Sequence, residues 1–123
     1  MTTVQAKRIR WDDMPSERLN DKLERRYVTG EHITLAQFQL ARGCTVPTHA
    51  HPNEQLSYVL TGRMRFRMGA EGGEVVELRG GEVLMIPPGL PHSAEALEDS
   101  VVADSFSPVR ADWIEKRDAY LRG

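Results

Sequence analysis

Two short stretches, residues 43–62 and 81–92, constrain the fold of this 123-residue chain more than any other feature. Each begins at a glycine and contains prolines, and together they hold three of the four histidines. In the first, His49 and His51 are one residue apart, so on an extended strand their imidazoles would point to the same face. In the second, a Pro- and Gly-rich corner ends at His92. Because neutral imidazole is the commonest metal ligand among side chains, the pattern indicates a metal site built from both stretches.

Short runs with the alternation of a strand fill most of the chain between turns rich in Gly and Pro. They span residues 31–41, 55–60, 63–68, 74–78, 83–86 and 100–106. In the first run the apolar positions slip by one residue after Leu35, which predicts a bulge near Ala36 or Gln37. Many short strands at near-regular spacing predict an all-β sandwich or barrel. A closed jelly-roll barrel of this size can hold a small ligand in its interior.

The two ends of the chain carry weaker patterns. We describe residues 1–30 as an N-terminal arm, in which residues 16–26 fit either a short helix or an extended segment at a sheet edge. Residues 110–121 place apolar side chains at helical spacing, which predicts a short amphipathic helix covering the sheet. We therefore expect a single domain, with the β-barrel and its C-terminal helix over residues 31–123.

Composition excludes several classes of partner. The formal net charge is −2, so no basic field favours nucleic acid or an anionic membrane surface. No apolar run approaches the roughly 18 residues that a spanning helix needs, and the first residues lack the apolar core of a signal peptide. The single Cys44 rules out an intramolecular disulfide, and we expect it to be a small buried hydrophobe. These observations favour a cytoplasmic location.

The spacing of the two stretches resembles the two motifs of the cupin superfamily. The first motif reads Gly43, five residues, His49-x-His51, three residues, Gln55, six residues, Gly62, with Gln in place of the usual Glu. The second reads Gly81, five residues, Pro87-x-Gly89-x-x-His92, but Ala96 stands where the family usually has Asn. The resemblance implies a single-domain cupin jelly roll with one divalent metal ion, for which Ni, Zn, Mn, Fe and Cu all remain possible. Its ligands would be His49, His51, Gln55 and His92.

The neutral Gln55 leaves the full positive charge on such an ion, which favours an anionic ligand over dioxygen chemistry. If Gln55 faces the interior, then Leu56, Tyr58 and Leu60 face outward from the same strand. An outward face with Leu, Tyr and Leu is an association surface unless the chain covers it. We therefore expect a homodimer.

Residues 96–113, ALEDSVVADSFSPVRADW, resemble the C-terminal segment of the small single-domain cupins of pectin and alginate breakdown. In those proteins the cupin promotes linearisation of 4,5-unsaturated monouronates to keto acids. The resemblance implies an enzyme acting on a small anionic sugar acid. Asp104 would move a proton, Arg110 would bind the uronate carboxylate and take part in catalysis, and Phe106 would pack on the sugar ring.

Other interpretations stay open at this point. Asp104 could pair with Arg110 without a catalytic role, and Phe106 could belong to the core. His32 could be a fourth histidine ligand, although a surface position fits it better. The chain could also be a metal-dependent dioxygenase or isomerase on another small polar substrate, or a non-enzymatic cupin that binds a small ligand.

Overall fold

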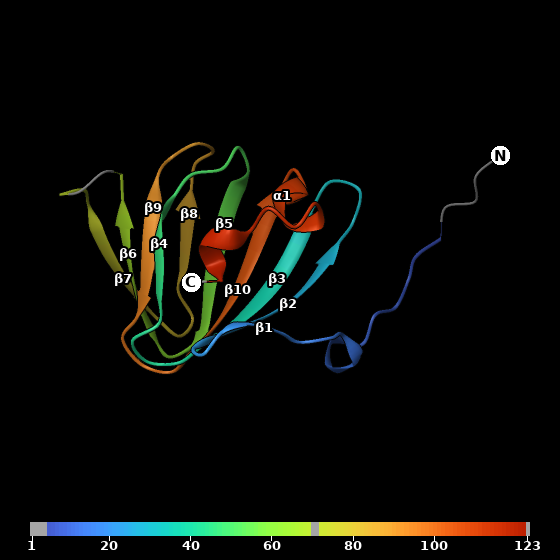
Figure 1. Cartoon of the computed structure of the whole chain (residues 1–123), viewed down its shortest axis with the longest axis horizontal. Helices are drawn as coiled ribbons and strands as arrows, with labels where there is room; N and C mark the ends of the chain where they lie inside the picture. Colours follow the sequence, from blue (N-terminus) through green and yellow to red (C-terminus); the bar gives the residue numbers. More distant parts are fainter. Residues whose placement is uncertain (1–4, 70–71, 123) are drawn as a thin grey trace.

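The computed structural model describes residues 5–69 and 72–122, whose strands form two antiparallel sheets around a common core (Figure 1). The larger sheet has the order β1 (Glu17–Asn20), β2 (Leu23–Thr29), β3 (Thr34–Leu40), β10 (Ser100–Ser107), β5 (Glu54–Thr61) and β8 (Val83–Ile86). The smaller has the order β4 (Thr45–His49), β9 (His92–Ala96), β6 (Arg63–Met68) and β7 (Val75–Arg79). The predicted all-β barrel is confirmed.

The inner face of the larger sheet changes from apolar to polar along its strands. The register pairs Val102 of β10 with Val59 of β5, and two residues further on Asp104 lies opposite Ser57. All four side chains are at most 8% exposed. One end of the barrel is therefore filled by a hydrophobic core, while polar groups occupy the interior toward the other end.

Strand β3 is regular, so the predicted bulge near Ala36 and Gln37 is wrong. Its pairing with β2 and with β10 runs without a register shift. Ala36 and Phe38 are buried, whereas Ile33 and Leu35 are 57% and 43% exposed. The apparent slip arises because the outward-facing positions at the start of this run also carry apolar residues.

The N-terminal residues that fitted either a helix or an edge segment form strands β1 and β2 at one edge of the larger sheet. Before them, a 3₁₀ turn η1 (Trp11–Asp13) places the Trp11 indole N–H 2.6 Å from the side-chain oxygen of Gln37, to which it donates. Of the two alternatives, the extended segment at a sheet edge is the one that the structure has.

The C-terminal segment is less helical than predicted. It contains only a four-residue helix, α1 (Ala111–Ile114), and a 3₁₀ turn, η2 (Ala119–Leu121). Lys116 between them adopts a positive φ of 60°, which an α-helix does not tolerate. The predicted continuous helix over 110–121 is therefore broken, although Trp113 and Leu121 are buried as its apolar face required.

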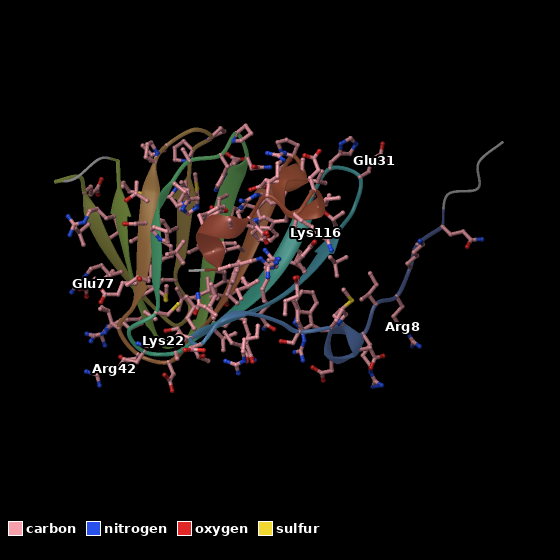
Figure 2. All side chains as sticks on the ribbon, viewed as in Figure 1. Arg8, Lys22, Glu31, Arg42, Glu77 and Lys116 are labelled. Atoms are coloured by element: carbon pink, nitrogen blue, oxygen red, sulfur yellow. The ribbon has the colours of Figure 1, made fainter. Side chains whose placement is uncertain are left out.

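Many charged side chains lie on the surface. Glu31, Arg42 and Glu77 are exposed, and all three point away from the barrel in Figure 2. Cys44, in contrast, is 2% exposed and free, as expected for a small hydrophobe. Within the described part of the chain, no helix is both long and apolar enough to cross a bilayer.

Two motif glycines share a left-handed backbone, with φ of +93°, but differ in their surroundings. A Cβ on Gly62 would lie 2.5 Å from the carbonyl oxygen of Asp99 and closer still to the Ser100 hydroxyl, whereas no described atom lies within 4 Å of one on Gly81. We expect Gly62→Ala to lower the free energy of unfolding by about 3 kcal/mol or more, and Gly81→Ala by only about 1–2 kcal/mol. Urea unfolding of both variants measures the difference, and equal losses would contradict the steric explanation.

Candidate metal centre

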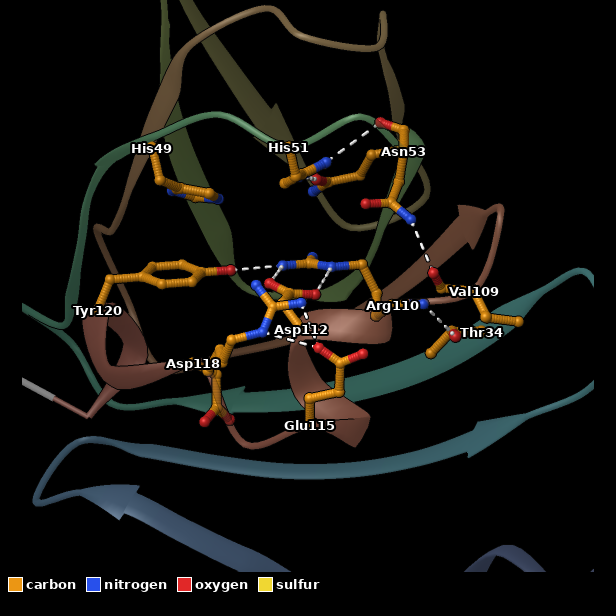
Figure 3. A network of polar contacts seen from close by, with 12 residues as sticks. Thr34, His49, His51, Asn53, Val109, Arg110, Asp112, Glu115, Asp118 and Tyr120 are labelled. Carbon is orange, nitrogen blue, oxygen red and sulfur yellow. Dashed lines mark hydrogen bonds and ion pairs between the residues drawn. The ribbon is translucent and has the colours of Figure 1, made fainter.

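Three histidines converge at the polar end of the barrel. His49 ends β4, His92 begins β9, and the antiparallel pairing of these strands places the two residues opposite each other. His51 follows in the loop before β5, and one potential ligand atom from each of the three lies within 4.8 Å of the others. His49 and His51 are side by side in Figure 3. The three imidazoles that the sequence analysis singled out could therefore hold one metal ion.

Each imidazole is oriented by a backbone carbonyl two residues away. Nδ1 lies 2.9 Å from the Pro47 oxygen in His49, 3.1 Å from the Asn53 oxygen in His51, and 2.8 Å from the Leu90 oxygen in His92. An Nδ1–H that donates to the carbonyl leaves the lone pair on Nε2. In His92 this Nε2 is buried and has no hydrogen-bond partner among the described residues.

Gln55 adds an oxygen to this set. Its side chain is 5% exposed, while the neighbouring Glu54 is exposed, so Gln55 is the one that faces the interior. Its amide nitrogen donates to the Ser57 hydroxyl at 2.9 Å, and its Oε1 lies 3.0 Å from Nε2 of His51.

The contacts of His51 provide a test of whether a cation fits. Its two ring nitrogens each face an oxygen atom, but a neutral imidazole carries only one N–H. One of the two contacts therefore joins lone pairs, and a cation near Nε2 and Oε1 would remove that conflict. Three imidazole nitrogens and a carboxamide oxygen suit a divalent transition metal. The residues thus fit the ion that the motifs imply.

Burial keeps these histidines neutral. It lowers the pKa of His49 and of His51 from 6.5 to about 4, and the pKa of His92 shifts in the same direction. The positive charge of Arg110 adds to the lowering in all three. Because a metal ligand must be unprotonated, the set is ready for binding at neutral pH.

The three other predicted site residues line the same cavity as His49 and His92. Asp104 is 8% exposed, and burial raises its pKa to about 7 despite the opposing effects of the Ser57 hydrogen bond and the Arg110 charge. The Arg110 guanidinium lies over the rings of Phe106 and Trp113, at 4.6 and 4.4 Å from their centres. By contrast, the His32 side chain is 80% exposed beside Glu31, outside this cluster.

Sequence reasoning missed the groups that hold Arg110. Its carboxylate partner is Asp112, to which Nε and Nη2 donate at 3.0 and 2.8 Å, rather than Asp104. Nη2 also donates to the Tyr120 hydroxyl, as drawn in Figure 3. The buried Asn53 fixes the two residues before Arg110, since its amide donates to the Pro108 and Val109 carbonyls. The only signal in the sequence was the position of Asp112 and Asn53 close to motif residues.

Residues 36–103, more than half of the chain, match the family model of the cupin domain. The chain belongs to the cupin family. This cupin is 31% identical over 106 residues to the pectin degradation protein KdgF of Dickeya dadantii (strain 3937), covering 84% of this chain and 94% of that protein.

Solved structures agree with this assignment. The structure of KdgF from Halomonas sp. matches this cupin with a TM-score of 0.75 and 28% identity, over 83% of this chain and 94% of that one. An RmlC-like cupin from Shewanella frigidimarina NCIMB 400 shares the fold, with a TM-score of 0.76 and 24% identity over 83% and 90% of the two chains.

The buried groups predict how stability depends on pH. The pKa of His49 and His51 falls from 6.5 to about 4 on folding, so between these values the unfolded chain binds more protons and acid destabilises the fold. The pKa of Asp104 rises from 3.8 to about 7, so its contribution has the opposite sign. Without metal, the unfolding temperature of Asp104→Asn should therefore fall more steeply from pH 6.5 to 4 than that of the unsubstituted protein.

Thermal unfolding followed by circular dichroism measures both curves, with exposed Asp21→Asn as the control. Parallel curves for Asp104→Asn and the unsubstituted protein would mean that Asp104 is ionised in the folded state throughout this range.

Proposed function

We propose that this cupin is a metal-dependent enzyme that promotes ring opening of 4,5-unsaturated uronate monosaccharides to keto acids, within pectin breakdown. The similarity to a pectin degradation protein over most of both chains supports the substrate class. The observation that carries the proposal is the content of one cavity: neutral imidazoles, a buried guanidinium and a buried carboxyl whose pKa is about 7.

The proposed ligands of one divalent ion are His49, His51, His92 and Gln55. Ni, Zn, Mn, Fe and Cu all accept such a set. When bound, the ion would supply Lewis-acid polarisation of a substrate oxygen. All four ligands are neutral, so the site as a whole keeps a positive charge that favours an anionic substrate.

Arg110 is the proposed partner of the uronate carboxylate. Asp112 and Tyr120 accept from its Nε and Nη2, so Nη1 is the nitrogen proposed to donate to the carboxylate. Burial strengthens this charge-assisted hydrogen bond by excluding water. The guanidinium lies 4.6 Å from the centre of the Phe106 ring, a cation–π contact. Phe106 also lines the cavity in which we place the sugar.

Asp104 is the proposed proton-transfer group. Ring opening breaks the bond between the anomeric carbon and the ring oxygen. It also moves one proton from the anomeric hydroxyl to C4, so that substrate and product are isomers and no oxidant is needed. A carboxyl whose pKa is about 7 is present in both protonation states near neutral pH, and can accept that proton and return it.

The test is consumption of 4,5-unsaturated galacturonate by purified, metal-loaded protein, followed by loss of the ultraviolet absorbance of the conjugated double bond. We expect turnover above the spontaneous rate, loss of turnover after chelation, and recovery on adding metal back. Asp104→Asn should slow turnover by about 100-fold or more, because proton transfer by a positioned group contributes on that order. Elemental analysis should show unchanged metal content.

Exposed Asp21→Asn is the matched control and should leave turnover unchanged. Normal turnover in Asp104→Asn would remove Asp104 from the mechanism. Binding of the uronate without turnover would identify a ligand-binding cupin instead, and oxygen uptake would identify an oxygenase.

We also propose that this cupin is a homodimer through the outer face of the larger sheet. Leu56, Tyr58 and Leu60 are 38–44% exposed there. The pairing of β5 with β8 places Met85, which is 72% exposed, beside Leu56. An apolar surface that spans neighbouring strands favours association with a second copy.

Light scattering should give twice the chain mass of 13.9 kDa at micromolar concentration. Leu56→Glu should give the monomer, since it buries a charge in the proposed interface. Val75→Glu is the matched control, because Val75 is 44% exposed on the other sheet. A monomeric mass for the unsubstituted protein would contradict the proposal.

A further inference from the structure

Tyr120 touches the site from the C-terminal segment, residues 111–121. Its ring stacks on the imidazole of His49, with ring centres 4.6 Å apart and an angle of 30° between the planes. Its hydroxyl accepts a hydrogen bond from Nη2 of Arg110 (Figure 3). Tyr120 therefore contacts both a candidate metal ligand and the candidate carboxylate-binding residue, and it lines the cavity with them.

The guanidinium of Arg110 is held from several directions. Asp112 accepts from Nε and Nη2, and the rings of Phe106 and Trp113 lie against the plane of the group. Tyr120 adds the contact from the side of His49. Within the described residues, the side-chain hydrogen bonds of Arg110 use Nε and Nη2, which leaves Nη1 for a ligand. An arginine side chain has many rotamers, so such contacts decide where this nitrogen lies.

Tyr120 is itself fixed by the β1–β2 hairpin. Asp118, two residues before it, is 2% exposed and forms an ion pair of 2.9 Å with Arg25 of β2. The carbonyl of Leu121, the next residue, accepts a hydrogen bond of 3.2 Å from Asn20. A buried ion pair allows little freedom of position. The contacts of Asp118 and Leu121 therefore hold the chain before and after Tyr120, and keep its ring over His49.

We propose that Tyr120 is a positioning residue: its hydroxyl fixes the Arg110 guanidinium beside the histidine cluster, so that one bound anion can reach both. The inference rests on the proposed function for the identity of that anion, a uronate. The positioning itself concerns any small carboxylate that binds here.

The test is Tyr120→Phe, which keeps the ring on His49 and removes only the hydroxyl. We expect the KM for 4,5-unsaturated galacturonate to rise about tenfold, since one hydrogen bond to a charged group is lost, while kcat stays within about twofold. The dissociation constant of saturated D-galacturonate, measured by calorimetry on zinc-loaded protein, should rise by the same factor. Zinc affinity should not change.

Tyr58→Phe is the matched control, because Tyr58 lies on the outer face of β5, outside the cavity, and the substitution keeps the ring in the proposed dimer surface. Unchanged KM and galacturonate affinity in Tyr120→Phe would overturn the proposal, as would a fall in kcat at constant KM.

A double-mutant cycle separates positioning from direct contact. If Tyr120 acts through Arg110, then Arg110→Lys with Tyr120→Phe should bind galacturonate no more weakly than Arg110→Lys alone. Additive losses would show that the hydroxyl contacts the ligand itself, and would overturn the positioning role. If the unsubstituted protein turns over no uronate, the proposed function fails, but the galacturonate measurements still decide the role of Tyr120.

Discussion

The hydrogen bonds between the imidazoles and backbone carbonyls are the interactions on which the site depends. In His49, His51 and His92 the partner carbonyl lies two residues away in the chain. The direction of each Nε2 lone pair is therefore set by the local turn, not by distant packing. Orientation of a ligand by a hydrogen bond to its second ring nitrogen also raises its basicity toward a metal. Because burial lowers the pKa of all three, the same geometry keeps them neutral.

The carboxyls of Asp104 and Asp112, both near Arg110, have pKa values shifted in opposite directions. Burial raises the pKa of Asp104 to about 7, and the charge of Arg110 does not offset it. Burial also tends to raise the pKa of Asp112, but its hydrogen bonds with Arg110 lower it overall. Asp112 is thus a counterion that makes a buried guanidinium tolerable beside the candidate metal ligands. The raised pKa of Asp104 fits the proton exchange proposed for it, as in other sites where two carboxyls have different environments.

The parts of this molecule that could be predicted from sequence are those fixed by local geometry. The glycines and prolines around His49, His51 and His92 set the turns, and the alternation of β5 and β10 places Gln55 and Asp104 inside. The surroundings of Arg110 could not be predicted, because they depend on where the C-terminal segment crosses the barrel. At helical spacing Tyr120 resembles any packing residue. The helix breaks at Lys116 because this residue adopts a positive φ, which its residue type does not indicate. The prediction of a bulge in β3 was wrong because apolar residues also occupy the exposed face at the start of this segment.

Trp113 connects strand β2 to the site. The guanidiniums of Arg25 and Arg110 each lie 4.4 Å from its ring centre. Arg25 is 2% exposed, and its Nε and Nη1 have no partner among the described residues, so its burial is costly even with Asp118 beside it. A buried ion pair of this kind contributes little net stability compared with apolar packing, but it tolerates few alternative positions. Its place next to Trp113 and two residues from Tyr120 therefore fits a role in specifying where the C-terminal segment lies, and through that segment where Arg110 meets the histidines.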